Sequence, residues 1–169
     1  MEKQLSVYFD YTCPYCYQGV SDLIALLPGY PQLTVTWVPC EAHPLPEPAW
    51  VHSRLASQMM LAVAAYGGDL IQFHMELFEL CFVKRQRIDD TERLIHTAVL
   101  CGADREKVAA AMKNKQFEQK VDENNILVWE SMRLEAVPCY QSGEKLLTSH
   151  EDVMLPKKNL KAFLDAIGK

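Results

Sequence analysis

Two cysteines separated by two residues are the part of this sequence with the clearest chemistry. They form the segment Cys13-Pro14-Tyr15-Cys16, which follows the apolar run at residues 5–9. An apolar strand that leads into C-x-x-C and then a helix is the setting of a dithiol redox site. The first N–H groups of a helix are unpaired and carry partial positive charge, so they stabilise a thiolate placed there. Such a thiol can titrate well below the free value of roughly 8.5.

The spacing brings the second sulfur within one helical turn of the first, so the pair can close a small, reversible disulfide. Pro14 suits the first turn, because its missing N–H would lack a partner there. Two other interpretations remain: half of a zinc site, or a pair of inert buried thiols. A structural zinc site usually needs a second pair of ligands, and the other cysteines stand singly: Cys40, Cys81, Cys101 and Cys139.

Composition and charge argue against several classes of protein. The chain has 169 residues and a net charge of −5, and it contains no basic run, which argues against a nucleic-acid partner. No segment is long and apolar enough to span a bilayer, and the first residues lack the apolar region of a signal peptide. Six cysteines are too few for a disulfide scaffold, and four thiols outside the motif fit a reducing compartment. We therefore expect a cytoplasmic protein, with a mature chain whose leader has been removed as the alternative, and no role for a membrane. We expect no metal and no cofactor.

The elements that must position the cysteines come first in the chain. The sequence predicts a strand over residues 4–10, a helix over 14–27, a turn over 28–31 and a strand over 33–38. In the second strand Leu33, Val35 and Trp37 alternate with threonines, which is the period of a strand with one buried face. Strand, helix and strand in this order imply a parallel pair with a right-handed crossover.

A proline-rich linker at residues 39–48 leads into a helical zone at 49–134. Apolar residues recur there at helical spacing and indicate core packing. Glycines end the predicted stripes, and Asp104 is expected to cap a helix over 105–112. A last helix of this zone is expected at about residues 117–133.

The final zone predicts a hairpin and a helix. Residues 139–141 and 145–148 flank Ser-Gly-Glu at 142–144, and a helix is expected over 156–167. The sequence thus predicts an α/β, thioredoxin-like fold with an all-helical insertion between its β-α-β and β-β-α halves. In terms of domains, residues 1–48 and 135–169 would form the thioredoxin-like domain and 49–134 the helical insertion.

Three short segments carry a resemblance to a known family. Residues 9–19, Phe-Asp-Tyr-Thr-Cys-Pro-Tyr-Cys-Tyr-Gln-Gly, resemble the active-site segment of the DsbA-like thioredoxin family, with the FrnE-like oxidoreductases as the most similar branch. Residues 135–140, Glu-Ala-Val-Pro-Cys-Tyr, resemble the family's Val-Pro before the third strand, where the proline is cis. Residues 37–41, Trp-Val-Pro-Cys-Glu, resemble a weaker segment after the second strand.

The resemblance implies thiol–disulfide exchange with protein or small-molecule partners. Cys13, nearer the helix start and solvent, would be the nucleophile, and Cys16 would resolve the mixed disulfide. Pro138 would pack beside the disulfide, and Val137 would present its backbone to an extended substrate. We assign Pro14, Tyr15, Val137 and Pro138 to substrate binding.

Related branches leave alternatives open. The 2-hydroxychromene-2-carboxylate isomerases and kappa-class glutathione transferases typically carry serine at the position of Cys13, so a glutathione-dependent isomerase or transferase of small aromatic compounds is one alternative. A non-enzymatic binding or chaperone-like module is another. Tyr15 stands where strongly oxidising members carry histidine, so a less oxidising pair is expected. Asp10 is either a proton acceptor for Cys16 or a capping carboxylate. Cys139 is either a third thiol or a buried strand residue, and His43 is expected to be an ordinary loop residue.

Overall fold

The computed structural model describes residues 3–42 and 52–168. His43 and most of the proline-rich linker lie outside the described residues. The first half of the fold comprises β1 (Lys3–Phe9), α1 (Pro14–Leu26), the short helix η1 (Leu27–Gly29) and β2 (Leu33–Pro39). The second half comprises β3 (Ala136–Ser142), β4 (Lys145–Ser149) and α7 (Lys157–Gly168).

The four strands form one mixed sheet in the order β2-β1-β3-β4. β1 pairs with β2 in parallel, from Lys3 opposite Leu33 to Phe9 opposite Pro39. β1 pairs with β3, and β3 with β4, in antiparallel fashion. β1 is central and has Leu5, Val7 and Phe9 fully buried, whereas β2 lies at an edge and keeps the exposed threonines that its alternation predicts. The predicted thioredoxin-like fold is confirmed.

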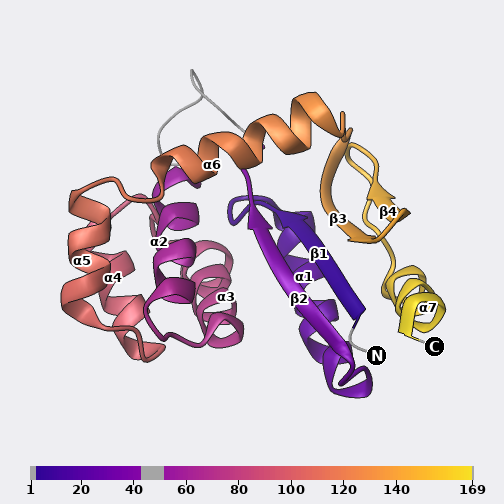
Figure 1. The fold of residues 1–169 in the computed structure, drawn as a ribbon, viewed down its shortest axis with the longest axis horizontal. Coiled ribbons are helices and arrows are strands. Elements are labelled where there is room, and N and C mark those ends of the chain that lie inside the picture. Colours follow the sequence, from indigo (N-terminus) through magenta and orange to yellow (C-terminus); the bar gives the residue numbers. More distant parts are fainter. Residues whose placement is uncertain (1–2, 43–51, 169) are drawn as a thin grey trace.

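Only helices and loops are found among the described residues between β2 and β3. They are α2 (Arg54–Ala65), α3 (Leu70–Phe78), η3 (Glu79–Val83), α4 (Thr91–Leu100), α5 (Arg105–Lys113), α6 (Glu118–Asn125) and η4 (Ile126–Ser131). In Figure 1, α2 to α5 form a group beside the sheet, and α6 leads from that group back toward β3. The division into domains at residues 48/49 and 134/135 stays a prediction.

Local chemistry sets the ends of the helices. Asp69, Asp90 and Asp104 cap α3, α4 and α5, and each carboxylate accepts the N–H three residues further on. Gly67 and Gly102 follow α2 and α4 with positive φ angles of 85° and 90°, which glycine adopts without steric cost. The predicted helix at 117–133 is continuous in space, but its second part, η4, widens into a π-helical turn.

The sheet and the helical group share one buried core. α1 packs on one face of the sheet, against β3, with α7 beside it, while α3 contacts α1. Tyr17 of α1 stacks against both Phe78 and Phe82, at centroid distances of 5.5 and 5.2 Å. Both the sheet and the helical group therefore hold α1, the helix that begins at the C-x-x-C segment, in place. No helix in the described parts of the chain is long and apolar enough to cross a membrane.

Candidate active site

Cys13 is the N-cap residue of α1, and Pro14 occupies the first helical position. The Cys13 backbone is extended (φ −94°, ψ 120°), and the Cys13 N–H donates to the Asp10 carbonyl at 3.2 Å. Cys13 is 9% exposed, whereas Cys16, one turn further along α1, is fully buried. The structure thus places both sulfurs at the helix start, with Cys13 on the solvent side.

The pKa values of the two thiols are shifted in opposite directions from that of a free thiol. The pKa of Cys13 is lowered, chiefly because the Cys16 side chain donates a hydrogen bond to it, with help from backbone N–H groups of the first turn. The pKa of Cys16 is raised well above that of a free thiol, first by burial and then by the neighbouring Cys13. The Asp10 N–H also donates to the Cys16 sulfur at 3.3 Å. Of the two thiols, Cys13 is therefore the one that ionises at the lower pH.

The Asp10 carboxylate is fully buried beneath the cysteine loop. One oxygen accepts the N–H and hydroxyl of Thr12, both at 2.8 Å, and the other accepts the Ala42 N–H at 2.6 Å. Burial raises the pKa of Asp10 despite these hydrogen bonds, which oppose the shift. Asp10 therefore ties the end of β1 to the loop after β2, as a capping carboxylate would.

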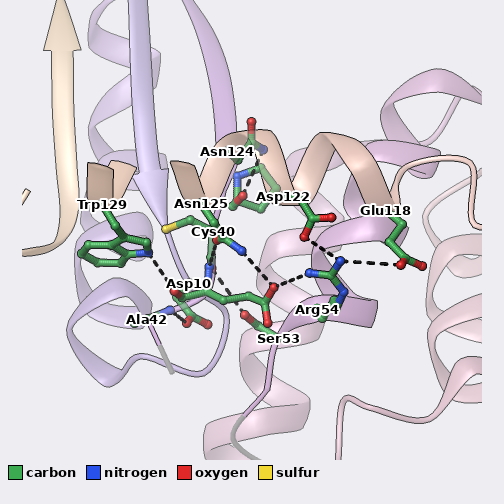
Figure 2. Close-up of polar contacts among 12 residues, drawn as sticks. Asp10, Cys40, Ala42, Ser53, Arg54, Glu118, Asp122, Asn124, Asn125 and Trp129 are labelled. Atoms are coloured by element: carbon green, nitrogen blue, oxygen red, sulfur yellow. Dashed lines mark hydrogen bonds and ion pairs between the residues drawn. The ribbon is translucent and has the colours of Figure 1, made fainter. Parts of the chain in front are cut away.

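A set of polar contacts holds the loop after β2 against the helices (Figure 2). Glu41, almost fully buried, pairs with Arg54 at 2.8 Å and accepts the Asn125 side-chain amide at 3.0 Å. The Asn125 oxygen accepts the Glu41 N–H, and the Trp129 indole donates to the Glu41 carbonyl at 2.9 Å. Arg54 also pairs with Asp122 at 2.7 Å. This set links α2, α6 and η4 to the loop that contacts Asp10.

Phe9 and Tyr11, the neighbours of Asp10 in the chain, belong to a buried aromatic cluster. Phe9, Tyr11 and Trp37 surround His74 of α3, with the Trp37 and His74 ring centroids 4.3 Å apart. The Tyr11 hydroxyl and His74 Nδ1 share a hydrogen bond of 2.8 Å. Burial lowers the pKa of His74 to about 3, so the ring is neutral. His74 has no sequence signal of its own, because it follows Phe73 inside an apolar stripe.

The peptide bond between Val137 and Pro138 is cis, as predicted. The Cys13 sulfur lies 3.8 Å from the Val137 carbonyl oxygen, so β3 begins beside Cys13. Gly19 of α1 permits this approach: a Cβ there would lie 2.7 Å from Pro138 Cγ and 2.6 Å from the Tyr140 hydroxyl oxygen.

A cavity of about 880 Å³ opens in front of Cys13. Four of the predicted site residues line it, namely Cys13, Pro14, Tyr15 and Val137. Cys16 and Pro138 do not line it, since they are buried behind that surface. The other residues that line the cavity were not among the predicted site residues: Glu41, Ala42, Asn125, Ile126, Trp129, Glu130, Glu135, Ala136, Glu151 and Asp152.

The remaining cysteines lie away from this opening. Cys139 is fully buried and donates to the Ala136 carbonyl at 3.1 Å, and burial raises its pKa, as expected of a buried strand residue. Burial likewise raises the pKa of Cys40 well above its usual range and those of Cys81 and Cys101 to about 11. In the portion of the chain that the structure describes, no group of three His, Cys, Asp or Glu residues is arranged to hold a metal ion.

The model of the DSBA-like thioredoxin domain matches residues 4–168, nearly the whole chain. The chain belongs to this family. A search of curated proteins found no match.

Several solved structures have the same fold. MdbA, a thiol-disulfide oxidoreductase from Actinomyces oris, is 20% identical with a TM-score of 0.70, covering 99% of this chain and 82% of that one. Reduced DsbA1 from Neisseria meningitidis is 15% identical with a TM-score of 0.68, covering 98% and 84%. A protein from Nitrosomonas europaea proposed to be a protein disulfide isomerase is 14% identical with a TM-score of 0.77, covering 98% and 97%.

Proposed function

We propose that this DsbA-like protein is a thiol–disulfide oxidoreductase, with Cys13 as the nucleophile and Cys16 as the resolving thiol. The observation that carries the proposal is the contrast between two sulfurs in contact: Cys13 has a lowered pKa at the rim of a cavity, and Cys16 has a raised pKa behind it. A nucleophile must be ionised and reachable, whereas a resolving thiol needs only to reach the first sulfur.

In the direction of substrate reduction, the Cys13 thiolate would attack one sulfur of a substrate disulfide. The substrate S–S bond breaks, one substrate thiolate leaves, and a mixed disulfide with Cys13 forms. Cys16 then loses its proton and attacks the Cys13 sulfur. The products are the Cys13–Cys16 disulfide and a second substrate thiolate, so two electrons pass from the protein to the substrate. Oxidation of a dithiol substrate would be the same sequence in reverse.

The other site residues would bind the substrate. Val137 would present its backbone to an extended segment, with Pro14 and Tyr15 on the opposite wall of the cavity. Pro138 would pack beside the cysteine pair and hold the Val137 backbone in position. The contact between Cys13 and the Val137 carbonyl supports this arrangement. The partners would be protein or small-molecule disulfides and thiols, with glutathione among the candidates. The segment at residues 9–19 supports the FrnE-like branch, and the four additional thiols support a cytoplasmic location.

Two cysteine variants test the proposal. Cys13→Ser should abolish exchange on insulin or a scrambled disulfide substrate, because a hydroxyl neither attacks as a thiolate nor forms a disulfide. Cys16→Ser should accumulate mixed disulfides through Cys13, visible by mass spectrometry. Cys81→Ser, outside the motif, is the matched control and should keep wild-type exchange.

The same variants separate the glutathione-dependent alternative. An isomerase or transferase should tolerate Cys13→Ser, since its relatives carry serine there. Aromatic turnover retained by Cys13→Ser, with no disulfide exchange by the wild type, would overturn the proposal.

A further inference from the structure

The walls of the cavity in front of Cys13 come from four separate parts of the chain. These parts are the start of α1, the loop after β2, the end of α6 with the π-helical turn η4, and two further segments, the start of β3 with the residue before it and the turn after β4, which are counted together because they adjoin the same hairpin. Apolar side chains form much of the lining, including Pro14, Ile126, Trp129 and Val137. Cys13 and the first residues of β3 line the same cavity, so the charge and polarity of its walls act on any ligand that approaches Cys13.

Every charged residue that lines the cavity is an acid. Five of its lining residues are Glu or Asp, and none is Lys, Arg or His among the residues that the structure describes. Two of the five have positively charged or chargeable partners outside the lining: Glu41 pairs with Arg54 at 2.8 Å, and Glu135 with His150 at 2.9 Å.

The other three acids, Glu130, Glu151 and Asp152, are solvent-exposed and form no ion pair with any described residue. Glu130 lies on η4, whereas Glu151 and Asp152 lie in the turn after β4, so they belong to different walls. A cleft lined by charges of one sign concentrates ligands of the opposite sign and raises their association rate by roughly 10- to 1000-fold at low salt.

We infer that the cavity selects cationic substrates, namely extended peptide segments whose reactive cysteine is flanked by Lys or Arg. The inference rests on the proposed function, because it takes Cys13 as the attacking group. The aliphatic stems of Lys and Arg suit the apolar wall near Trp129, while their charged ends reach the three exposed carboxylates. The negative potential of these carboxylates disfavours ligands with a net negative charge, and glutathione is one of these.

Two peptides that differ only in charge test the inference. Each carries one cysteine in a mixed disulfide with a small neutral thiol, flanked by lysines in one peptide and by glutamates in the other. We expect the wild type to react faster with the lysine peptide by about tenfold at low ionic strength, and the ratio to shrink as salt screens the acids. Rates are followed by release of the small thiol.

Two triple variants locate the effect. Glu130→Gln, Glu151→Gln and Asp152→Asn together should bring the two rates to within about twofold of each other. Glu92→Gln, Glu106→Gln and Glu144→Gln together change the net charge equally on exposed residues that do not line the cavity, and should keep the preference. Equal rates in the wild type, faster reaction of the glutamate peptide, or an equal loss in both triple variants would overturn the inference.

A binding measurement separates this inference from the redox proposal. Fluorescence anisotropy of the labelled peptides with a Cys13→Ala variant reports charge preference without any exchange step. If neither peptide is exchanged by the wild type but the lysine peptide binds more tightly, the redox proposal fails and the charge assignment stands. If both peptides are exchanged but they react and bind equally, the charge assignment alone fails.

Discussion

The two sides of the redox helix differ in how they use carboxylates. The closed side is formed by Phe9, Asp10, Tyr11, Cys16 and His74, which are all buried. There the Asp10 carboxylate accepts hydrogen bonds from the backbone N–H groups of Thr12 and Ala42. On the open side, the cavity in front of Cys13, three carboxylates face solvent without partners among the described residues. Burial on the closed side keeps Cys16 protonated and His74 neutral, whereas charge on the open side remains available to a ligand.

The largest effect expected on the closed side is a pH dependence of stability that comes from His74. Its pKa is about 3 in the folded protein against 6.5 for an ordinary histidine, so the unfolded chain binds more protons between these values. Stability is therefore present above about pH 6.5 and is lost as the pH falls, by at most about 1.4 kcal/mol per pH unit from this group.

Urea unfolding at several pH values checks this expectation. His74→Gln should lose less stability than the wild type between about pH 6.5 and 4.5, because it lacks the titrating ring. His96→Gln changes an exposed histidine and should keep the wild-type slope. Equal slopes for the wild type and His74→Gln would show that this side does not hold a neutral histidine.

A somewhat smaller effect is expected where α1 meets β3. Gly19→Ala places a Cβ 2.7 Å from Pro138 and 2.6 Å from the Tyr140 hydroxyl, so the helix or strand must shift. Overpacking of this kind costs about 1–3 kcal/mol of unfolding free energy. Gly29→Ala is the matched control, since its Cβ would meet nothing within 4 Å, and its effect should stay within about 0.5 kcal/mol. Equal denaturation midpoints for both variants would contradict the close approach.

The smallest effect concerns the charge of Asp10. Its carboxylate raises the pKa of Cys13 and of Cys16 through charge repulsion, against the larger influences on each thiol. Asp10→Asn should therefore lower the pH at which Cys13 is half alkylated. Asp22→Asn, a buried acid further along α1, should leave that midpoint unchanged. A higher midpoint in Asp10→Asn would mean that its hydrogen bonds to the loop matter more than its charge.

Features with local signals were predictable from the sequence. The strand that leads into Cys13, the Pro14 helix start, the hairpin around Gly143 and the Asp104 cap each depend on neighbouring residues, and the structure has all of them. The cis Val137–Pro138 bond followed from resemblance rather than from spacing.

Features made by distant residues were not predictable. Glu41 meets Asn125 across 84 positions, and Glu130 and Asp152 reach the cavity from η4 and the turn after β4. Nothing in an exposed glutamate shows which surface it will face, and nothing in an apolar stripe shows that His74 will meet Tyr11. The π-helical turn at 126–131, which brings Trp129 to Glu41, has no local signature either.

Selective alkylation of the reduced protein tests the central claim most directly. Iodoacetamide is added near neutral pH, and mass spectrometry measures the rate of labelling at each cysteine. Because Cys13 is reachable and has a lowered pKa while Cys16 is buried and has a raised one, Cys13 should be labelled at least about tenfold faster. Equal labelling of the two, or faster labelling of Cys16, would contradict the division of the site into an open nucleophile and a closed resolving thiol.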